Sequence, residues 1–198
     1  SDLQSSLVQS CFYIAYLLAP VPVLLFLQRF GYKRGIIAGL LLYATGALLF
    51  WPAAESVTYG AFLGALFVIA CGIVFIETAG TGIIVTLGAP ERAEWRINFA
   101  QAFNPIGAIL GVLVGRQFIF SGQDLSPADQ AAMSPAALAA WRASEAQAVQ
   151  MPYFVIACVL LTIAALVALT RFPASATRTE QGSPLAGLRH ILRSKLFR

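Results

Sequence analysis

One carboxylic acid stands out in this sequence because of its surroundings. Glu77 lies near the middle of a long apolar segment, and no other Asp or Glu is found deep within such a segment. A carboxylate at the centre of a lipid bilayer costs about 3 kcal/mol, so such a group usually faces a protein interior or a water-filled cavity. We predict a proton-coupling role for Glu77. The alternative is a structural carboxyl group that only joins helices.

Three amide side chains recur at intervals of three residues after this segment. Asn98, Gln101 and Asn104 therefore lie on one stripe of a helix. Amides both donate and accept hydrogen bonds, so they suit neutral ligands rich in hydroxyl groups. Amides without partners are costly in lipid, so these face the interior and bind either a ligand or a neighbouring helix. We predict ligand contact above all for Gln101 and Asn104, with Asn98 nearer the membrane interface.

Two further side chains complete the candidate substrate site. Thr81 lies one helical turn after Glu77 on the same face, within the run Ala-Gly-Thr-Gly of residues 79–82. Glycines weaken a helix and let a ligand or another helix approach closely. Tyr13 and Tyr16 stand three residues apart in the first apolar segment, and we include Tyr13 among the substrate contacts. Ordinary packing between helices is the alternative for Thr81 and for Tyr13.

Few other residues could do chemistry. The chain has one histidine, His190, which excludes a His-based metal cluster, and its three cysteines lie in apolar segments without paired spacing. An enzyme would need a second group cooperating with Glu77 at the same depth, and the sequence does not supply one. We therefore expect no metal site, no cofactor and no enzymatic activity, with a proton as the coupling ion.

The elements that must position these residues follow from composition. Of the 198 residues, 59% are hydrophobic and 11% are charged, against about 25% charged in an average soluble domain. This excludes a water-soluble globule and a nucleic-acid module, and it makes the lipid bilayer the main partner of the surface. The apolar segments show no alternation of apolar and polar residues, which membrane β-strands would require. We therefore predict an all-α, polytopic membrane bundle of five spans, at about residues 5–28, 35–54, 59–89, 97–120 and 148–170.

The basic residues predict the orientation. Eleven of the thirteen Lys and Arg residues fall in the first and third connections and in the C-terminal tail. By the positive-inside rule these parts are cytoplasmic, so we expect an integral plasma-membrane protein whose first residues are outside and whose last residues are inside. A start outside without a signal peptide suggests that another span precedes Ser1, and we interpret the chain as a fragment.

Local signals predict further elements. Ser-Pro pairs at 126–127 and 134–135 are typical of helix starts, and they predict short extracellular helices, the second at about 135–148. Within the tail, 172–198, residues 185–196 carry apolar side chains at helical spacing with basic residues between them, which predicts a basic amphipathic helix at the cytoplasmic interface. The alternative is a linker helix that is solvated or packs on a partner. Glycines four residues apart at 35–39, 60–64 and 107–115 predict close helix packing.

Several blocks in order carry a resemblance to a known family. They are the run from Tyr43 to Glu55, Ile76-Glu-Thr-Ala79, Leu87-Gly88, and Asn98-Phe-Ala-Gln-Ala-Phe-Asn104 with Gly107. From about residue 5 to 173 the chain resembles the fucose–galactose–glucose:proton symporter family of the major facilitator superfamily. The resemblance implies helices two to six of a twelve-helix carrier in the bacterial inner membrane. Residues 1–171 are then part of its N-terminal six-helix half, and 172–198 begin the cytoplasmic linker.

The resemblance also implies functional residues and partners. Glu77 matches the helix-four carboxylate involved in substrate and proton coupling, and Gln101 and Asn104 match sugar-contacting amides of helix five. The implied partners are a small sugar, L-fucose or a related hexose, together with the first helix and the C-terminal half that this chain lacks. We expect sugar:proton symport by alternating access. The alternatives are a transport-inactive homologue, a sugar sensor, or a carrier for another small polar solute.

Two departures from the family pattern matter. Where the family commonly has Glu-Thr-Ala-Ala-Asn-Pro, this chain has Glu77-Thr-Ala-Gly-Thr-Gly82, which lacks an amide and a proline. The superfamily's glycine and aspartate after its second helix are replaced by Leu24 and Gln28. The usual gating ion pair through that aspartate cannot form here.

Overall fold

The computed structural model describes residues 2–56, 58–118 and 132–172, and these residues form helices without any strand. The predicted all-α class is therefore confirmed. The predicted helix at 126–127 and the predicted amphipathic helix of the tail lie outside the described residues. In chain order the elements are α1 (Asp2–Leu18), α2 (Pro20–Leu48), α3 (Phe50–Ser56), α4 (Tyr59–Thr86), the 3-10 turn η1 (Pro90–Arg92), α5 (Ala93–Gln101), α6 (Phe103–Phe118), α8 (Pro135–Ala148) and α9 (Gln150–Leu169).

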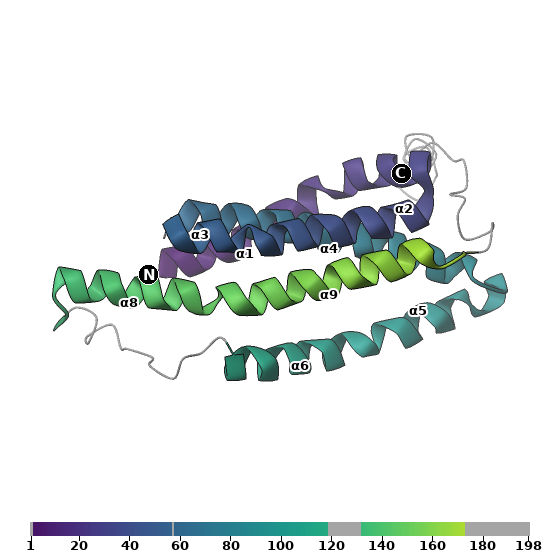
Figure 1. Cartoon of the computed structure of the whole chain (residues 1–198). Coiled ribbons are helices and arrows are strands. Elements are labelled where there is room, and N and C mark those ends of the chain that lie inside the picture. Colours follow the sequence, from purple (N-terminus) through teal and green to yellow (C-terminus); the bar gives the residue numbers. More distant parts are fainter. Residues whose placement is uncertain (1, 57, 119–131, 173–198) are drawn as a thin grey trace, which may run out of the picture.

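Gly31 divides the longest apolar stretch into two membrane passes. By length and hydropathy, four described stretches could cross a membrane: Pro20–Ser56, Tyr59–Thr86, Pro90–Arg116 and Gln150–Leu169. Within the first of them Gly31 has φ 81° and ψ 169°, a backbone conformation that favours glycine. The chain reverses there, so α1 and the start of α2 run one way and the rest of α2 with α3 runs back (Figure 1). The passes then follow the predicted order of spans.

Prolines explain where the helices differ from the predicted spans. Proline has no amide proton and crowds the carbonyl four residues earlier, so a helix bends before it. Pro20 divides the first predicted span into α1 and the start of α2, and Pro105 divides the fourth, which begins at Ala93 rather than 97. The third span ends at Thr86, and Gly88 follows with φ 143°.

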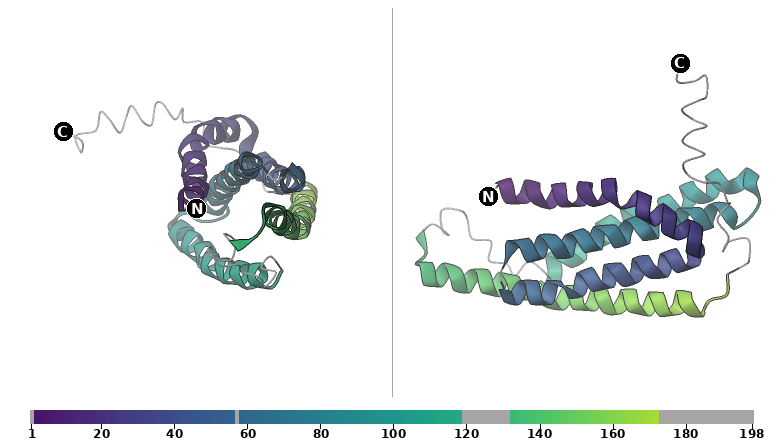
Figure 2. Two further views of the ribbon diagram at one scale, coloured as in Figure 1. Left: turned by 90° about the vertical axis from the view of Figure 1, so that its left-hand side faces the viewer. Right: turned by 90° about the horizontal axis from the view of Figure 1, so that it is seen from above.

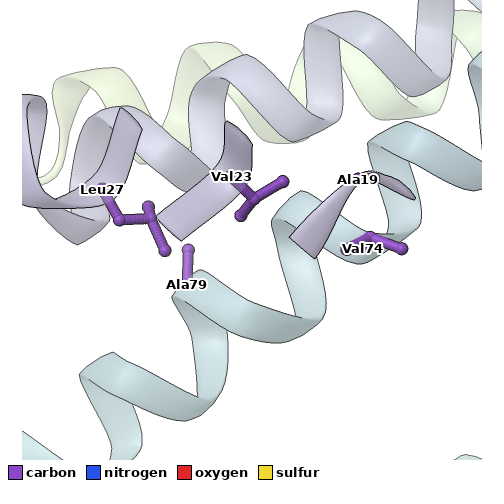
Figure 3. Packing of buried hydrophobic residues seen from close by; sticks show 5 residues of the cluster. All are labelled: Ala19, Val23, Leu27, Val74 and Ala79. Carbon is purple, nitrogen blue, oxygen red and sulfur yellow. The ribbon is translucent and has the colours of Figure 1, made fainter. Parts of the chain in front are cut away.

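The core forms where α2 and α4 cross. Ala19, Val23 and Leu27 pack against Val74 and Ala79 of α4 (Figure 3). The second pass of α2, after Gly31, also packs on α4: a Cβ atom on Gly72 would lie 2.6 Å from the amide nitrogen of Tyr43 and 2.8 Å from the carbonyl oxygen of Gly39. Only glycine allows the two backbones to come this close. The predicted close packing at 35–39 is confirmed.

The other glycine pairs do not pack in this way. A Cβ atom at Gly60, Gly64, Gly107 or Gly111 would meet nothing within 4 Å among the described residues. The prediction of close packing there is wrong for the part of the chain that the structure describes. The reason is visible in α6, where no residue with a described side chain is buried, and Figure 2 shows α5 and α6 as an arm set apart from α9.

Helix α9 lies along α2 and α3, and α8 extends it past one end of the bundle (Figure 1). The rings of Phe50 and Tyr153 stack with centroids 3.7 Å apart, which joins α3 to α9. Ser134 accepts a hydrogen bond from the amide of Ala137 at 3.3 Å and so begins α8 at Pro135. This confirms the predicted helix start at the second Ser-Pro pair.

Two basic side chains bind the C-terminal ends of helices at the opposite end. Arg96 donates to the carbonyl oxygens of Ile84, Val85 and Ala89 at 2.9 to 3.0 Å, and thus ties α5 to the end of α4. Lys33 donates to the carbonyl of Ala168, in the last turn of α9, and to that of its C-cap residue Thr170, both at 2.8 Å. Cations stabilise helix C-termini because the unpaired carbonyls there carry negative partial charge.

Candidate functional site

Glu77 is held by a tyrosine of another helix. The hydroxyl of Tyr16 in α1 donates a hydrogen bond to Oε2 of Glu77 in α4 across 3.2 Å. Among the residues described, Tyr16 is the hydrogen-bond partner that the structure gives Glu77. Both side chains are on the exposed side of their helices, whereas Ala79 faces the core. The carboxylate therefore lies on the face of α4 that the α2 contact leaves uncovered.

The residues after Glu77 divide between this open face and the helix packing. Thr81 is exposed, as the prediction of a substrate contact requires. Thr78 instead donates to the carbonyl of Val74 in its own helix at 2.7 Å, so its hydroxyl is engaged. A Cβ atom at Gly80 would meet nothing within 4 Å, but one at Gly82 would collide with the ring of Tyr32. Tyr32 thus packs where the family pattern has a proline.

The predicted amide pair forms across the bend between α5 and α6. Nδ2 of Asn104 donates to Oε1 of Gln101 at 2.8 Å, and both side chains are exposed. This leaves the amide NH2 of Gln101 and the oxygen of Asn104 to meet a ligand, so the pair presents donors and an acceptor together. Pro105 supplies no amide proton to the carbonyl of Gln101, which adds a second acceptor at the same place.

The structure brings the predicted residues together only in part. Glu77 makes no hydrogen bond with Gln101 or Asn104 among the described residues, although α4 and α5 are in contact near Arg96. Asn98 is exposed one turn before Gln101 and shares its stripe. The hydrogen bonds of Arg96 join α4, which carries Glu77, to α5, which carries Asn98 and Gln101.

Tyr16 is the residue that sequence reasoning missed. Its neighbour Tyr13 is 73% exposed, and the structure shows no hydrogen bond from it to another described residue. The spacing of the two tyrosines gave no ground for preferring one of them. The available signal was that Glu77 needs a donor within the membrane, and a hydroxyl of the first apolar segment is a suitable one.

Within the described residues there is no group of three His, Cys, Asp or Glu side chains that could hold a metal ion. The cysteines are unpaired thiols, and the thiol of Cys11 donates to the carbonyl of Leu63 at 3.3 Å. The candidate site therefore consists of a carboxylate, a hydroxyl and amides, groups whose chemistry suits protons and polar ligands.

By length and composition these apolar helices define a polytopic helical membrane protein. The sequence profile of the Major Facilitator Superfamily matches residues 1–198. The chain belongs to the Major Facilitator Superfamily. The resemblance stated from the sequence is thereby confirmed at the level of the superfamily, and the individual relatives refine it.

The similar proteins are sugar transporters by name. The chain is 40% identical to the L-fucose-proton symporter of Escherichia coli over 100% of its own length and 46% of that protein. It is 36% identical to the glucose/galactose transporter of Brucella abortus over 86% of this chain and 38% of that one. The chain thus spans about half the length of the curated relatives it matches.

Solved structures agree with the sequence comparison. A crystal structure of the Escherichia coli fucose:proton symporter superposes with a TM-score of 0.85, covering 98% of this chain and 48% of that one at 40% identity. A second crystal structure, of a transporter of this superfamily in the outward conformation, gives a TM-score of 0.82. The fold is that of one half of such a transporter, as predicted.

Proposed function

We propose that the complete protein is a sugar:proton symporter that works by alternating access, with L-fucose or a related hexose as substrate. The observation that carries the proposal is 40% identity over the whole chain to a protein named as an L-fucose-proton symporter. The site residues support it independently, since they combine one carboxylate at mid-membrane with paired amides. The protein moves its substrate without changing it chemically.

In this proposal Glu77 binds the coupling proton. It is the one acidic residue deep in an apolar segment of this sequence, and the face on which it lies is exposed. A proton taken from water on one side is carried on the carboxyl group and released to water on the other. Glu77 also contacts the sugar, because a carboxylate accepts hydrogen bonds from hydroxyl groups.

Gln101 and Asn104 bind the sugar hydroxyls, with Thr81, Asn98 and Tyr13 as further contacts. The hydrogen bond between Gln101 and Asn104 supports this role, because it orients both amides before the ligand arrives. The bend at Ala102 places the pair at the junction of α5 and α6. Bent helices at mid-membrane are a known way to build transporter substrate sites.

The proposed setting is the bacterial inner membrane, with the first described residues outside and residue 172 on the cytoplasmic side. The charge distribution supports this orientation, since Lys33 and Arg96 lie at one end of the bundle and α8 lies at the other (Figure 1). The proposed partners are the lipid bilayer, the sugar, and the first helix and C-terminal half of the same transporter.

Uptake into proteoliposomes that contain the complete protein tests the proposal. Labelled L-fucose, galactose and glucose are offered with an inward proton gradient, and a protonophore is added in a parallel sample. We expect at least one sugar to accumulate above its external concentration and the protonophore to abolish this accumulation. If none of the three is taken up, or if accumulation survives the protonophore, proton-coupled sugar transport is contradicted.

A further inference from the structure

Tyr16 is placed to act on the proposed proton carrier through a single hydrogen bond. We propose that Tyr16 is a positioning residue for Glu77, whose hydroxyl holds the ionised carboxylate and favours release of the coupling proton. This inference rests on the proposed function. The predicted site included Tyr13 of α1 only as a substrate contact. The inference gives α1 a part in proton release, through Tyr16.

The packing around the pair fixes its geometry. Ala15 and Ala19, on either side of Tyr16, are buried, and Ala19 packs against Val74 of α4 (Figure 3). Val74 lies one turn before Glu77 in the same helix. The contact between Ala19, directly after α1, and Val74 thus holds the end of α1 beside α4, near the level where the tyrosine hydroxyl lies 3.2 Å from Oε2 of the carboxylate.

The hydrogen bond depends on the charge of Glu77. The tyrosine hydroxyl is the donor, and an ionised carboxylate accepts from it in a charge-assisted bond about twice as strong as a neutral one. After proton uptake, only the carbonyl oxygen of the carboxyl group remains a good acceptor, so the bond weakens. Tyr16 thus favours the ionised form, and the link between α1 and α4 is stronger in that form.

This dependence separates two modes of transport. Net symport requires Glu77 to lose its proton in every cycle, so that the empty carrier returns with an ionised carboxylate. In exchange of sugar for sugar the carrier keeps its proton, and the ionised form is not needed. A residue that favours the ionised form is therefore required for net uptake and dispensable for exchange, whereas a residue needed for folding affects both.

The test compares net uptake and exchange in proteoliposomes of the complete protein carrying Tyr16→Phe, which removes the hydroxyl and keeps the ring. We expect the ratio of net proton-driven uptake to exchange to fall about tenfold, the factor that follows from losing roughly 1.4 kcal/mol. The ratio is the readout because a lower yield of folded protein reduces both rates equally. An unchanged ratio, or equal loss of both activities per reconstituted protein, would overturn the proposal.

Tyr153→Phe is the matched control, because its ring stacks on Phe50 at the α3–α9 contact and its hydroxyl has no part in the proposed site. We expect its ratio to remain that of the unaltered protein. A second measurement places Tyr16→Phe in a Glu77→Gln background, where it should change exchange less than about twofold if Tyr16 acts through Glu77. A larger change contradicts the inference even if net uptake behaves as expected.

Failure of the proposed function gives a different result. If the unaltered protein transports no sugar, or if Glu77→Gln still accumulates sugar against its gradient, proton coupling through Glu77 is wrong. If Glu77→Gln abolishes accumulation while Tyr16→Phe keeps the ratio, the function stands and the role of Tyr16 alone is refuted.

Discussion

Asn104 donates a hydrogen bond from its side-chain nitrogen to the side-chain oxygen of Gln101, 2.8 Å away and one turn earlier along the bent arm. Because each amide orients the other, we predict that their contributions to the proposed sugar binding are coupled. Neither side chain is covered by another described helix, so the hydrogen bond is made on an exposed face. The pair is thus arranged for a ligand that offers both donors and acceptors.

We expect Gln101→Ala and Asn104→Ala each to raise the KM for sugar about fivefold, since a neutral hydrogen bond contributes roughly 1 kcal/mol. The double variant should lose less than the product of the two effects, because each single variant already disorders its partner. The KM of each variant is obtained from initial rates of uptake at several sugar concentrations. Thr162→Ala in α9, whose hydroxyl bonds to its own helix, is the control and should leave KM unchanged. Strictly multiplicative effects would contradict the coupling.

Gly72→Ala should destabilise the protein by about 1 to 3 kcal/mol, because the new methyl group would meet the backbone of Tyr43 and Gly39 at less than 3 Å. The midpoint of thermal unfolding in detergent reports the change. Gly111→Ala is the matched control, since α6 leaves open space there and alanine is the better helix former. Equal midpoints for the two variants would show that the α2–α4 crossing tolerates a side chain.

Arg96→Ala should lower the free energy of unfolding by about 2 kcal/mol, because three carbonyl oxygens around the end of α4 lose their donor. Arg96→Lys should recover only part of this loss, because a single ammonium group cannot match the planar fork of arginine. The midpoint of thermal unfolding in detergent is measured for both variants, and Arg92→Ala, which removes an exposed arginine, is the control. A midpoint for Arg96→Ala equal to that of Arg92→Ala would refute the capping role.

Orientation can be measured by labelling single cysteines in a background where the three native cysteines are replaced by serine or alanine. A cysteine at Arg34 should react with an impermeant maleimide only from the cytoplasmic side. One at Ala136, in the first turn of α8, should react only from the outside. Labelling of both positions from the same side would contradict the odd number of passes between them.

Much of the fold followed from the sequence because hydropathy, basic residues and proline act locally. Apolar length placed the helices, and the Ser134 cap with Pro135 gave the start of α8 to the residue. The reversal between the first two spans was predicted, but its confinement to the single residue Gly31 and the division at Ala102 were not, because they depend on how the helices pack and bend together. The glycines of α6 were misjudged because spacing alone does not reveal whether a partner helix is present.

The candidate site divides in the same way. Glu77 and the amides stood out as polar residues where lipid should be, and one local hydrogen bond joins Gln101 to Asn104. Tyr16 could not be preferred over Tyr13, because its contact with Glu77 joins residues 61 positions apart and depends on the packing of α1 against α4. The C-terminal caps by Lys33 and Arg96 could not be predicted for the same reason, since the sequence does not show which carbonyls a basic side chain reaches.

The most direct test of the central claim is sugar accumulation by the Glu77→Gln variant of the complete protein in proteoliposomes with an imposed proton gradient. Glutamine keeps the size of the side chain and its capacity for hydrogen bonds, but its amide does not bind and release a proton near neutral pH. If Glu77 carries the coupling proton, uphill accumulation disappears while sugar exchange persists. Accumulation equal to that of the unaltered protein would contradict the account.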